Sequence, residues 1–149
     1  MKVAKSNGLS QSVIWTVGHS NRPVQELLTL LHNADIQTVI DCRSKPKSRW
    51  PQFNSAQLAL SLVHEHIRYE PRGKNIGGFG GNVQFDETLD ELTERAKSGE
   101  RLALLCSEGK PQDCHRGTIL TPELEKRGVK IEHLLYGATA RPAQAKLGL

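Results

Sequence analysis

The chain has 149 residues, 37% of them hydrophobic and 24% charged, which suits one globular domain with a buried core. Three cysteines, an odd number, argue against a disulfide framework and for a reducing compartment, so we expect a cytoplasmic protein. No apolar run approaches the roughly 18 residues of a membrane span, which argues against a membrane role, and the net charge of +4 permits an anionic partner without indicating a dedicated nucleic-acid arm.

Short apolar runs alternate with helical patterns along the chain. We expect strands at residues 13–18, 38–42, 67–70, 102–106 and 129–135. We expect helices at residues 24–34, 55–66 and 85–99, and a helix pair at 114–120 and 122–128, interrupted by Pro122. This alternation is typical of an α/β fold in which helices cover both faces of a mostly parallel sheet, here of about five strands.

One α/β domain over residues 12–136 accounts for these elements. Residues 1–11 are polar without periodicity, and we expect a flexible N-terminal leader there; residues 137–149 are small and basic, and we expect a C-terminal extension. The Gly-rich run KNIGGFGGN, residues 74–82, could expose amides to an anion, but a connecting loop or a mobile lid explains the same composition. It also lacks the Lys-Ser/Thr ending of a Walker motif, so we assign it no role.

Polar and reactive side chains follow three of the expected strands. The candidates after the first two strands are His19, Ser20, Asn21, Asp41 and Arg43, and those after the fourth strand are Cys106, Glu108, Cys114, His115 and Arg116. Because parallel strands end at one edge of a sheet, where ligands bind in such folds, we expect these side chains to form a single site.

The candidate cysteines differ in their surroundings. Cys42 is best explained as a small buried hydrophobe, and Cys106, which ends an apolar run, suits either the core or a site. Asp113 is a suitable N-cap, which would place Cys114 in the first helical turn, where the helix dipole stabilises a thiolate. Asp41 suits either a site or a carboxylate that caps a neighbouring loop.

Residues 43–54 mix basic and aromatic side chains. Arg43, Lys45, Lys47 and Arg49 are interleaved with Trp50 and Phe53. Charge for phosphate and rings for stacking are what a nucleotide or single-stranded nucleic acid would use, although a solvated loop held by one buried aromatic explains the pattern equally well.

Three ordered motifs, TVGHSNRP, VIDCRSKPKSRWPQFN and LLCSEGKPQDCHRG, resemble the family called Domain of Unknown Function 488, whose members show G-H-S, D-V-R-x-x-P followed by F-N, and C-x-E…C-H-R. The resemblance implies a Rossmann-like three-layer fold and supplies no reaction. Cys42 and Pro122 depart from the family pattern. The resemblance draws attention to His19, Ser20, Asp41, Arg43, Pro46, Phe53, Asn54, Cys106, Glu108, Cys114, His115 and Arg116.

The first interpretation of these residues is an enzyme, a thiol-dependent hydrolase or transferase, acting on a nucleotide, nucleic acid or other phosphate-bearing substrate. Cys114 would be the nucleophile, with a nearby imidazole as its base. The Cys-x5-Arg loop of phosphatases is excluded, because the residues six positions after Cys106 and Cys114 are Gln112 and Leu120. We expect catalytic roles for Cys114, His115, Cys106, His19, Asp41 and Glu108, and substrate contacts from Ser20, Asn21, Arg43, Arg116, Phe53 and Asn54.

Three other interpretations stay open. One is a non-catalytic module that binds a nucleotide or nucleic acid. Another is a metal site of Cys106, Cys114 and His115, although C-x7-C-H lacks the C-x2-C spacing of compact sites. The last is redox sensing through a Cys106–Cys114 disulfide. The sequence assigns no cofactor, and it names neither the substrate nor the oligomeric state.

Overall fold

A computed structural model describes residues 11–137 of the chain. Five strands form one all-parallel sheet in the order β3-β2-β4-β1-β5. The expected α/β fold with a mostly parallel sheet of about five strands is confirmed. The expected leader and C-terminal extension lie almost wholly outside the described residues. The strands are β1 (Val13–Gly18), β2 (Thr38–Asp41), β3 (Arg68–Pro71), β4 (Leu102–Cys106) and β5 (Lys130–His133).

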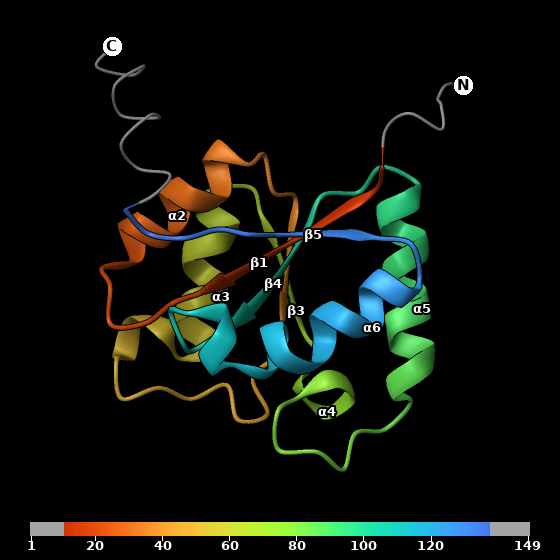
Figure 1. Cartoon of the computed structure of the whole chain (residues 1–149). Helices are drawn as coiled ribbons and strands as arrows, with labels where there is room; N and C mark the ends of the chain where they lie inside the picture. The colour runs from red at the N-terminus through yellow and green to blue at the C-terminus, as the bar shows by residue number, and fades with distance from the viewer. Residues whose placement is uncertain (1–10, 138–149) are drawn as a thin grey trace.

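The helices fall close to the expected positions, except that the Gly-rich region begins with a short helix, α4, that the sequence did not indicate (Figure 1). The α-helices are α2 (Val24–Asn33), α3 (Ser55–His64), α4 (Gly73–Ile76), α5 (Phe85–Lys97) and α6 (Thr121–Lys126). Three short turns complete the set: η1 (Pro51–Phe53), η2 (Pro111–Asp113) and the π-helical η3 (Arg116–Leu120).

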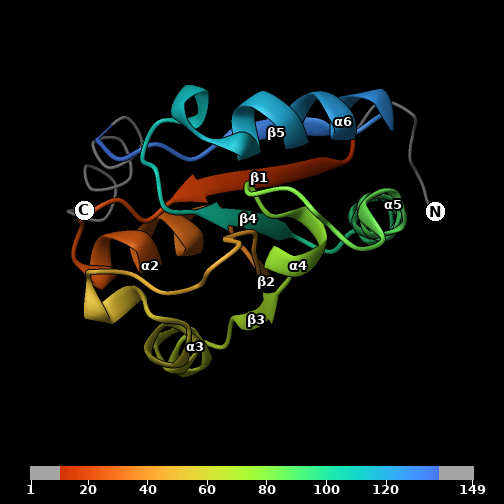
Figure 2. The ribbon, with the colours of Figure 1, turned by 90° about the horizontal axis from the view of Figure 1, so that it is seen from below.

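The sheet separates two hydrophobic clusters. Helices α2 and α3 cover one face, and α4, α5 and α6 cover the other (Figure 2). Side chains along each strand alternate between these faces: Val17 joins the α2–α3 cluster, whereas Ile14 joins the α5–α6 cluster. The central strand β4 is buried along its whole length, which explains why its sequence, LALLC, is continuously apolar.

The chain leaves the sheet edge through a π-helical turn at η3. Pro122 has no N–H to donate to the carbonyl of Thr118, so the α-helical pattern cannot run through this point. The N–H of Thr121 instead donates to the carbonyl of Arg116, five residues earlier. The expected interruption at Pro122 is therefore confirmed, and α6 begins only after the π-turn.

No helix within residues 11–137 is both long enough and apolar enough to cross a lipid bilayer. The longest of the described helices, α5, has 13 residues and several charged side chains.

Shortening a side chain at the centre of β4 should lower the stability of the protein considerably. Leu104 is completely buried in the α5–α6 cluster, and we expect Leu104→Ala to lower the free energy of unfolding by about 2–5 kcal/mol. Leu60 on α3 is 56% exposed, so Leu60→Ala should change it by less than about 1 kcal/mol. Urea denaturation of both variants checks this; equal losses would contradict the assigned burial.

Candidate functional site

The loops that follow β1 and β4 run together beyond the end of the sheet. The N–H of His19 donates to the carbonyl of Cys106 at 3.0 Å, and the N–H of Ser20 donates to that of Ser107 at 2.8 Å. Gly18 has no side chain at the point where the backbone of Glu108 crosses it, and a Cβ atom there would overlap the Glu108 carbonyl. A glycine is therefore required at this position for the loop after β4 to lie against β1.

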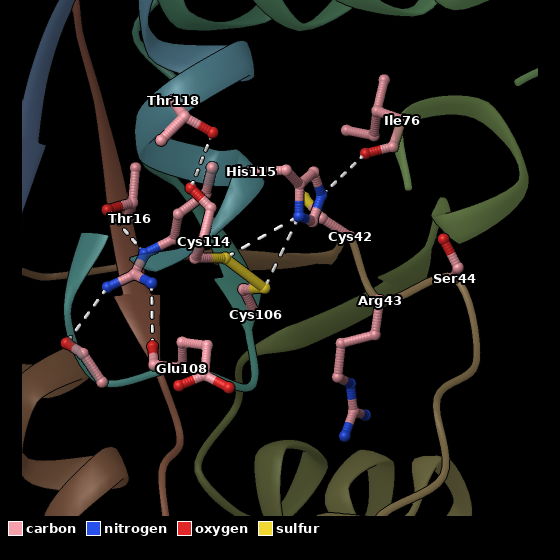
Figure 3. The surroundings of a disulfide bond; sticks show 12 residues. Thr16, Cys42, Arg43, Ser44, Ile76, Cys106, Glu108, Cys114, His115 and Thr118 are labelled. Carbon is pink, nitrogen blue, oxygen red and sulfur yellow. Dashed lines mark hydrogen bonds between the residues drawn. A yellow bond between two sulfur atoms is a disulfide. The ribbon is translucent and has the colours of Figure 1, made fainter. Parts of the chain in front are cut away.

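Cys106 and Cys114 meet at this edge and form a disulfide (Figure 3). Cys106 is the last residue of β4, and Cys114 follows η2, eight positions later in the sequence. Each is only 6% exposed, yet both border a pocket that opens to solvent. The sequence left this pairing open among several interpretations, and the structure contains it.

His115 faces both sulfur atoms. Its Nδ1 lies 3.7 Å from the Sγ of Cys106 and 3.7 Å from the Sγ of Cys114. Its Nε2 lies 3.0 Å from the carbonyl oxygen of Ile76, which can only accept, so Nε2 carries the hydrogen and the lone pair of Nδ1 faces the sulfurs. Burial lowers the pKa of His115 below its usual value, which favours the neutral ring.

The glycine-rich loop after α4 packs against the His115 ring. A Cβ atom on Gly78 would lie 2.9 Å from the ring's Nδ1, so any side chain there would displace the imidazole. The carbonyl of Ile76, at the end of α4, holds the other side of the ring. The loop for which the sequence predicted no role thus orients the histidine of the site.

The sequence predicted Asp113 as the N-cap of the helix, but the cap is the next residue, Cys114. Asp113 ends η2, because the N–H of Cys114 donates back to the carbonyl of Pro111 at 3.1 Å and closes that turn. Cys114 itself has extended backbone angles, and its carbonyl accepts from the N–H groups of Gly117 and Thr118. Cys114 is therefore the residue that caps the helical segment, and it does not lie inside the first turn as expected.

Arg116, two positions after Cys114, is completely buried. Its Nε donates to the hydroxyl of Thr16 at 3.1 Å, and its terminal nitrogens donate to the carbonyls of Glu108 at 2.8 Å and Gly109 at 3.4 Å. Burial lowers the pKa of Arg116 to about 10, so the side chain is still a cation at neutral pH. Its donors hold the loop between the two cysteines.

A second polar group lies on the α2–α3 side of the same edge. Arg43 makes a bidentate ion pair with Asp41, with N···O distances of 2.9 and 2.7 Å, and both side chains are buried. The hydroxyl of Tyr69 donates to the same carboxylate at 2.6 Å. The remaining nitrogen of Arg43 donates to the carbonyl of Phe53 at 2.6 Å, so each nitrogen of the guanidinium has a partner within the protein.

His19 belongs to this second group. Its ring stacks on Phe53 with centroids 4.3 Å apart, and its Nδ1 donates to the carbonyl of Ser20 at 2.7 Å. Its Nε2 is buried and finds no hydrogen-bond partner within residues 11–137. Burial lowers the pKa of His19 to about 4, which keeps the ring neutral at physiological pH.

Cys42, the third cysteine, is buried as expected. It packs in the α5–α6 cluster with no exposed surface, and its Sγ donates to the carbonyl of Ile40 at 3.5 Å. Burial also raises the pKa of this thiol far above its usual value. Cys42 is therefore an unreactive part of the core.

A pocket of about 280 Å³ opens beside the disulfide. Phe79, which is 77% exposed, forms part of its rim, and the Nζ of Lys45 lies 5.8 Å from the centre of that ring. Five of the expected site residues line the pocket: Arg43, Cys106, Glu108, Cys114 and His115. The other lining residues are Ser44, Lys45, Lys47, Gly78, Phe79, Ser107 and Asp113.

Residues 23–81 match the model of the family described as "Domain of unknown function DUF488". The resemblance to DUF488 is confirmed. The matched DUF488 segment contains the Asp41–Arg43 pair and residues 74–81 of the Gly-rich run, whereas Cys106, Cys114 and His115 lie beyond it. No curated protein and no solved structure matches the chain.

The remaining expected residues lie away from the sulfurs. Ser20 borders a separate pocket of about 460 Å³, and Asn21 is exposed. Phe53 is in the core, and the Asn54 side chain accepts from the N–H of Ser48 at 2.6 Å. The predicted site residues therefore form two groups, one around the disulfide and one around Asp41, and Arg43 of the second group borders the pocket beside the disulfide.

The sequence did not indicate two residues that orient His115, and both lie within the matched segment. Ile76 acts through its backbone carbonyl, which leaves no trace in the residue type. Gly78 acts by its lack of a side chain, and the only available signal was the Gly-rich composition of residues 74–82.

Replacing Arg116 should destabilise the whole edge. Arg116→Met leaves two carbonyls and one hydroxyl without their donor, and we expect it to lower the free energy of unfolding by about 3 kcal/mol. Arg49 is exposed, so Arg49→Met should change it by less than about 0.5 kcal/mol. Chemical denaturation of both variants measures the difference, and a neutral Arg116→Met would contradict this role.

The stability of the protein should fall between pH 6.5 and pH 4. The unfolded chain takes up a proton on His19 near pH 6.5, whereas the folded chain does so only near pH 4, so folding is favoured above pH 6.5 and loses about 3 kcal/mol as the pH falls to 4. His19→Gln cannot titrate and should lose about 2–3 kcal/mol less than the wild type between pH 7 and pH 4.5. Denaturation at both pH values tests this, and identical losses would refute it.

Proposed function

We propose that Cys106 and Cys114 form a redox-active disulfide, and that the protein is a thiol–disulfide oxidoreductase in which His115 transfers the proton. The observation that carries this proposal is the position of the His115 Nδ1, which lies 3.7 Å from each of the two sulfurs and has its lone pair directed at them. A base at this distance can take the proton from either thiol as it becomes the nucleophilic thiolate.

The surroundings of the disulfide favour a bond that is reduced and re-formed over a purely structural one. The loop that the disulfide closes is already held by Arg116 and by backbone bonds from His19 and Ser20. These contacts do not involve either sulfur, so the backbone of the edge can persist when the bond opens. The adjacent pocket gives a reacting partner access to the pair.

The reductant in this proposal is a thiol, either a small molecule or a cysteine of another protein. Its proton passes to the Nδ1 of His115, and its thiolate attacks one sulfur of the pair, forming a mixed disulfide. The bond between Cys106 and Cys114 breaks, its electron pair stays on the departing sulfur, and that sulfur takes the proton from His115. A second thiol resolves the mixed disulfide, so two thiols are oxidised to one disulfide while the protein gains two thiols.

A phosphate-bearing substrate, the first interpretation from the sequence, has weaker support in this geometry. Arg43 and Arg116 already bind groups of the protein, and the Cys114 sulfur is bonded to Cys106. Lys45, Lys47 and the ring of Phe79 are the lining groups that could contact a nucleotide. Nucleotide or nucleic-acid binding therefore stays a prediction, as does the cytoplasmic location.

Removing the proton acceptor should slow the closing of the disulfide. We reduce the full chain, remove the reductant, add oxidised glutathione and follow the loss of free thiols on the protein, after separating it from the glutathione that the exchange releases. The wild type should lose two thiols, and His115→Ala should do so at least about tenfold more slowly, since general bases contribute about 10²–10⁴-fold. His64→Ala, at an exposed histidine on α3, serves as the matched control and should react like the wild type.

Two outcomes would refute the proposal. One is a reduced wild type that keeps all of its thiols under these conditions. The other is an equal rate of closure in the wild type and in a folded His115→Ala protein, because the histidine would then play no part in the transfer.

A further inference from the structure

We infer that the reduced form of this site binds one soft divalent metal ion, with zinc as the best fit, through the Sγ atoms of Cys106 and Cys114 and the Nδ1 of His115. The inference rests on the proposed function in one respect, which is that the bond between the sulfurs can open. The three donor atoms already lie within 4.8 Å of one another, and among residues 11–137 they form the candidate metal-ligating cluster of the fold.

The distances between the donors suit a single ion. Ligands of one tetrahedral zinc, at about 2.3 Å for sulfur and about 2.0–2.1 Å for nitrogen, lie roughly 3.5–3.8 Å apart. The Nδ1 of His115 is 3.7 Å from each sulfur. Only the two sulfurs must move, from bonding distance to ligand distance, to complete this arrangement.

The backbone already allows that movement. The Cα atoms of Cys106 and Cys114 are 7.3 Å apart, whereas disulfides usually span about 4.4–6.8 Å between Cα atoms. Rotation of the two side chains away from each other is therefore enough to make room for an ion. The sequence spacing of C-x7-C-H counted against a metal site, but the loop held by Arg116 brings the ligands together in space.

The histidine is held as metal-binding histidines are. A ligating imidazole almost always donates its other N–H to a carbonyl or carboxylate, which fixes the tautomer and the orientation of the ring. The bond from Nε2 to the carbonyl of Ile76 at 3.0 Å is such a contact, and Gly78 packs directly against the same ring. The bond from Nε2 leaves Nδ1 as the ring nitrogen available to the ion.

The donor set determines the class of metal. Two thiolates and one imidazole select zinc and other soft or borderline ions over magnesium and calcium, which prefer oxygen ligands. Binding releases the two thiol protons, so two thiolates neutralise the charge of the divalent ion in a nearly buried position. Three protein ligands leave the fourth position for a water molecule or a bound partner from the pocket.

The disulfide and the metal site exclude each other, because the ion requires two thiolates and the sulfurs of a disulfide carry no negative charge. Two-electron oxidation by a disulfide such as oxidised glutathione would close the bond and expel the ion, and reduction would restore the site. Metal occupancy would thereby report the redox state of the thiol pool.

The test is a titration of the full chain with Co²⁺, a spectroscopic probe for zinc sites. The chain is reduced, and two accessible thiols are counted before metal is added. We expect one Co²⁺ per chain, with thiolate charge-transfer bands and the strong visible bands of tetrahedral cobalt, and displacement of Co²⁺ by Zn²⁺. The oxidised chain should bind at least about a hundredfold more weakly.

Variants assign the ligands. Cys106→Ser, Cys114→Ser and His115→Ala should each weaken Zn²⁺ binding by more than the ~10–100-fold that loss of an outer partner costs. Cys42→Ala and His64→Ala should bind like the wild type, and circular dichroism confirms that each variant is folded.

The outcomes separate this inference from the proposed function. A chain with two counted thiols that binds no Co²⁺ overturns the metal site, whatever the kinetics of disulfide closure. Binding that survives in a Cys106→Ser/Cys114→Ser protein also overturns it. Stoichiometric binding in a chain whose disulfide fails to close with oxidised glutathione supports the metal site and refutes the redox function alone.

Discussion

The edge of the sheet depends on the buried guanidinium of Arg116. A cation removed from water is costly unless its donors are satisfied, and here they bind the hydroxyl of Thr16 and the carbonyls of Glu108 and Gly109. These oxygens belong to strand β1 and to the loop after β4, while Arg116 itself opens the turn after Cys114. One side chain therefore fixes three segments relative to one another, and both cysteines lie on the segments that it holds.

The alternation of side chains along the strands explains why the polar residues form two groups. Asp41 points to the α2–α3 side, where Arg43 and Tyr69 bind it, whereas Cys106 points to the α5–α6 side, where His115 reaches it. Both groups meet at the carboxyl edge of the sheet, where Arg43 and the two cysteines border the same pocket. The ion pair on one side binds groups of the protein and holds the loop after β2, whereas the disulfide and the Nδ1 of His115 lie on the other side.

The fold was predictable because its signals are local. Strands such as LALLC read as continuous apolar runs, and Gly99 and Gly128 follow helices in the left-handed conformation that glycine adopts readily. The common edge of the three motifs also followed from the parallel sheet. The partner of His115 could not be predicted, because it is a backbone carbonyl, a group that every residue type carries. The cap at Cys114 could not be predicted either, because it depends on the tight turn of η2.

The burial of Cys42 has a consequence for the specificity of oxidation. Three cysteines allow three different pairings within one chain, and two of these would lock the protein in a wrong covalent form. Cys42 has no surface in contact with solvent, and its thiol resists ionisation, so an oxidant in solution reaches only the other two. The burial of Cys42 therefore leaves Cys106–Cys114 as the one pairing open to an oxidant in solution, and oxidation of the reduced chain would form the same bond each time without the help of an isomerase.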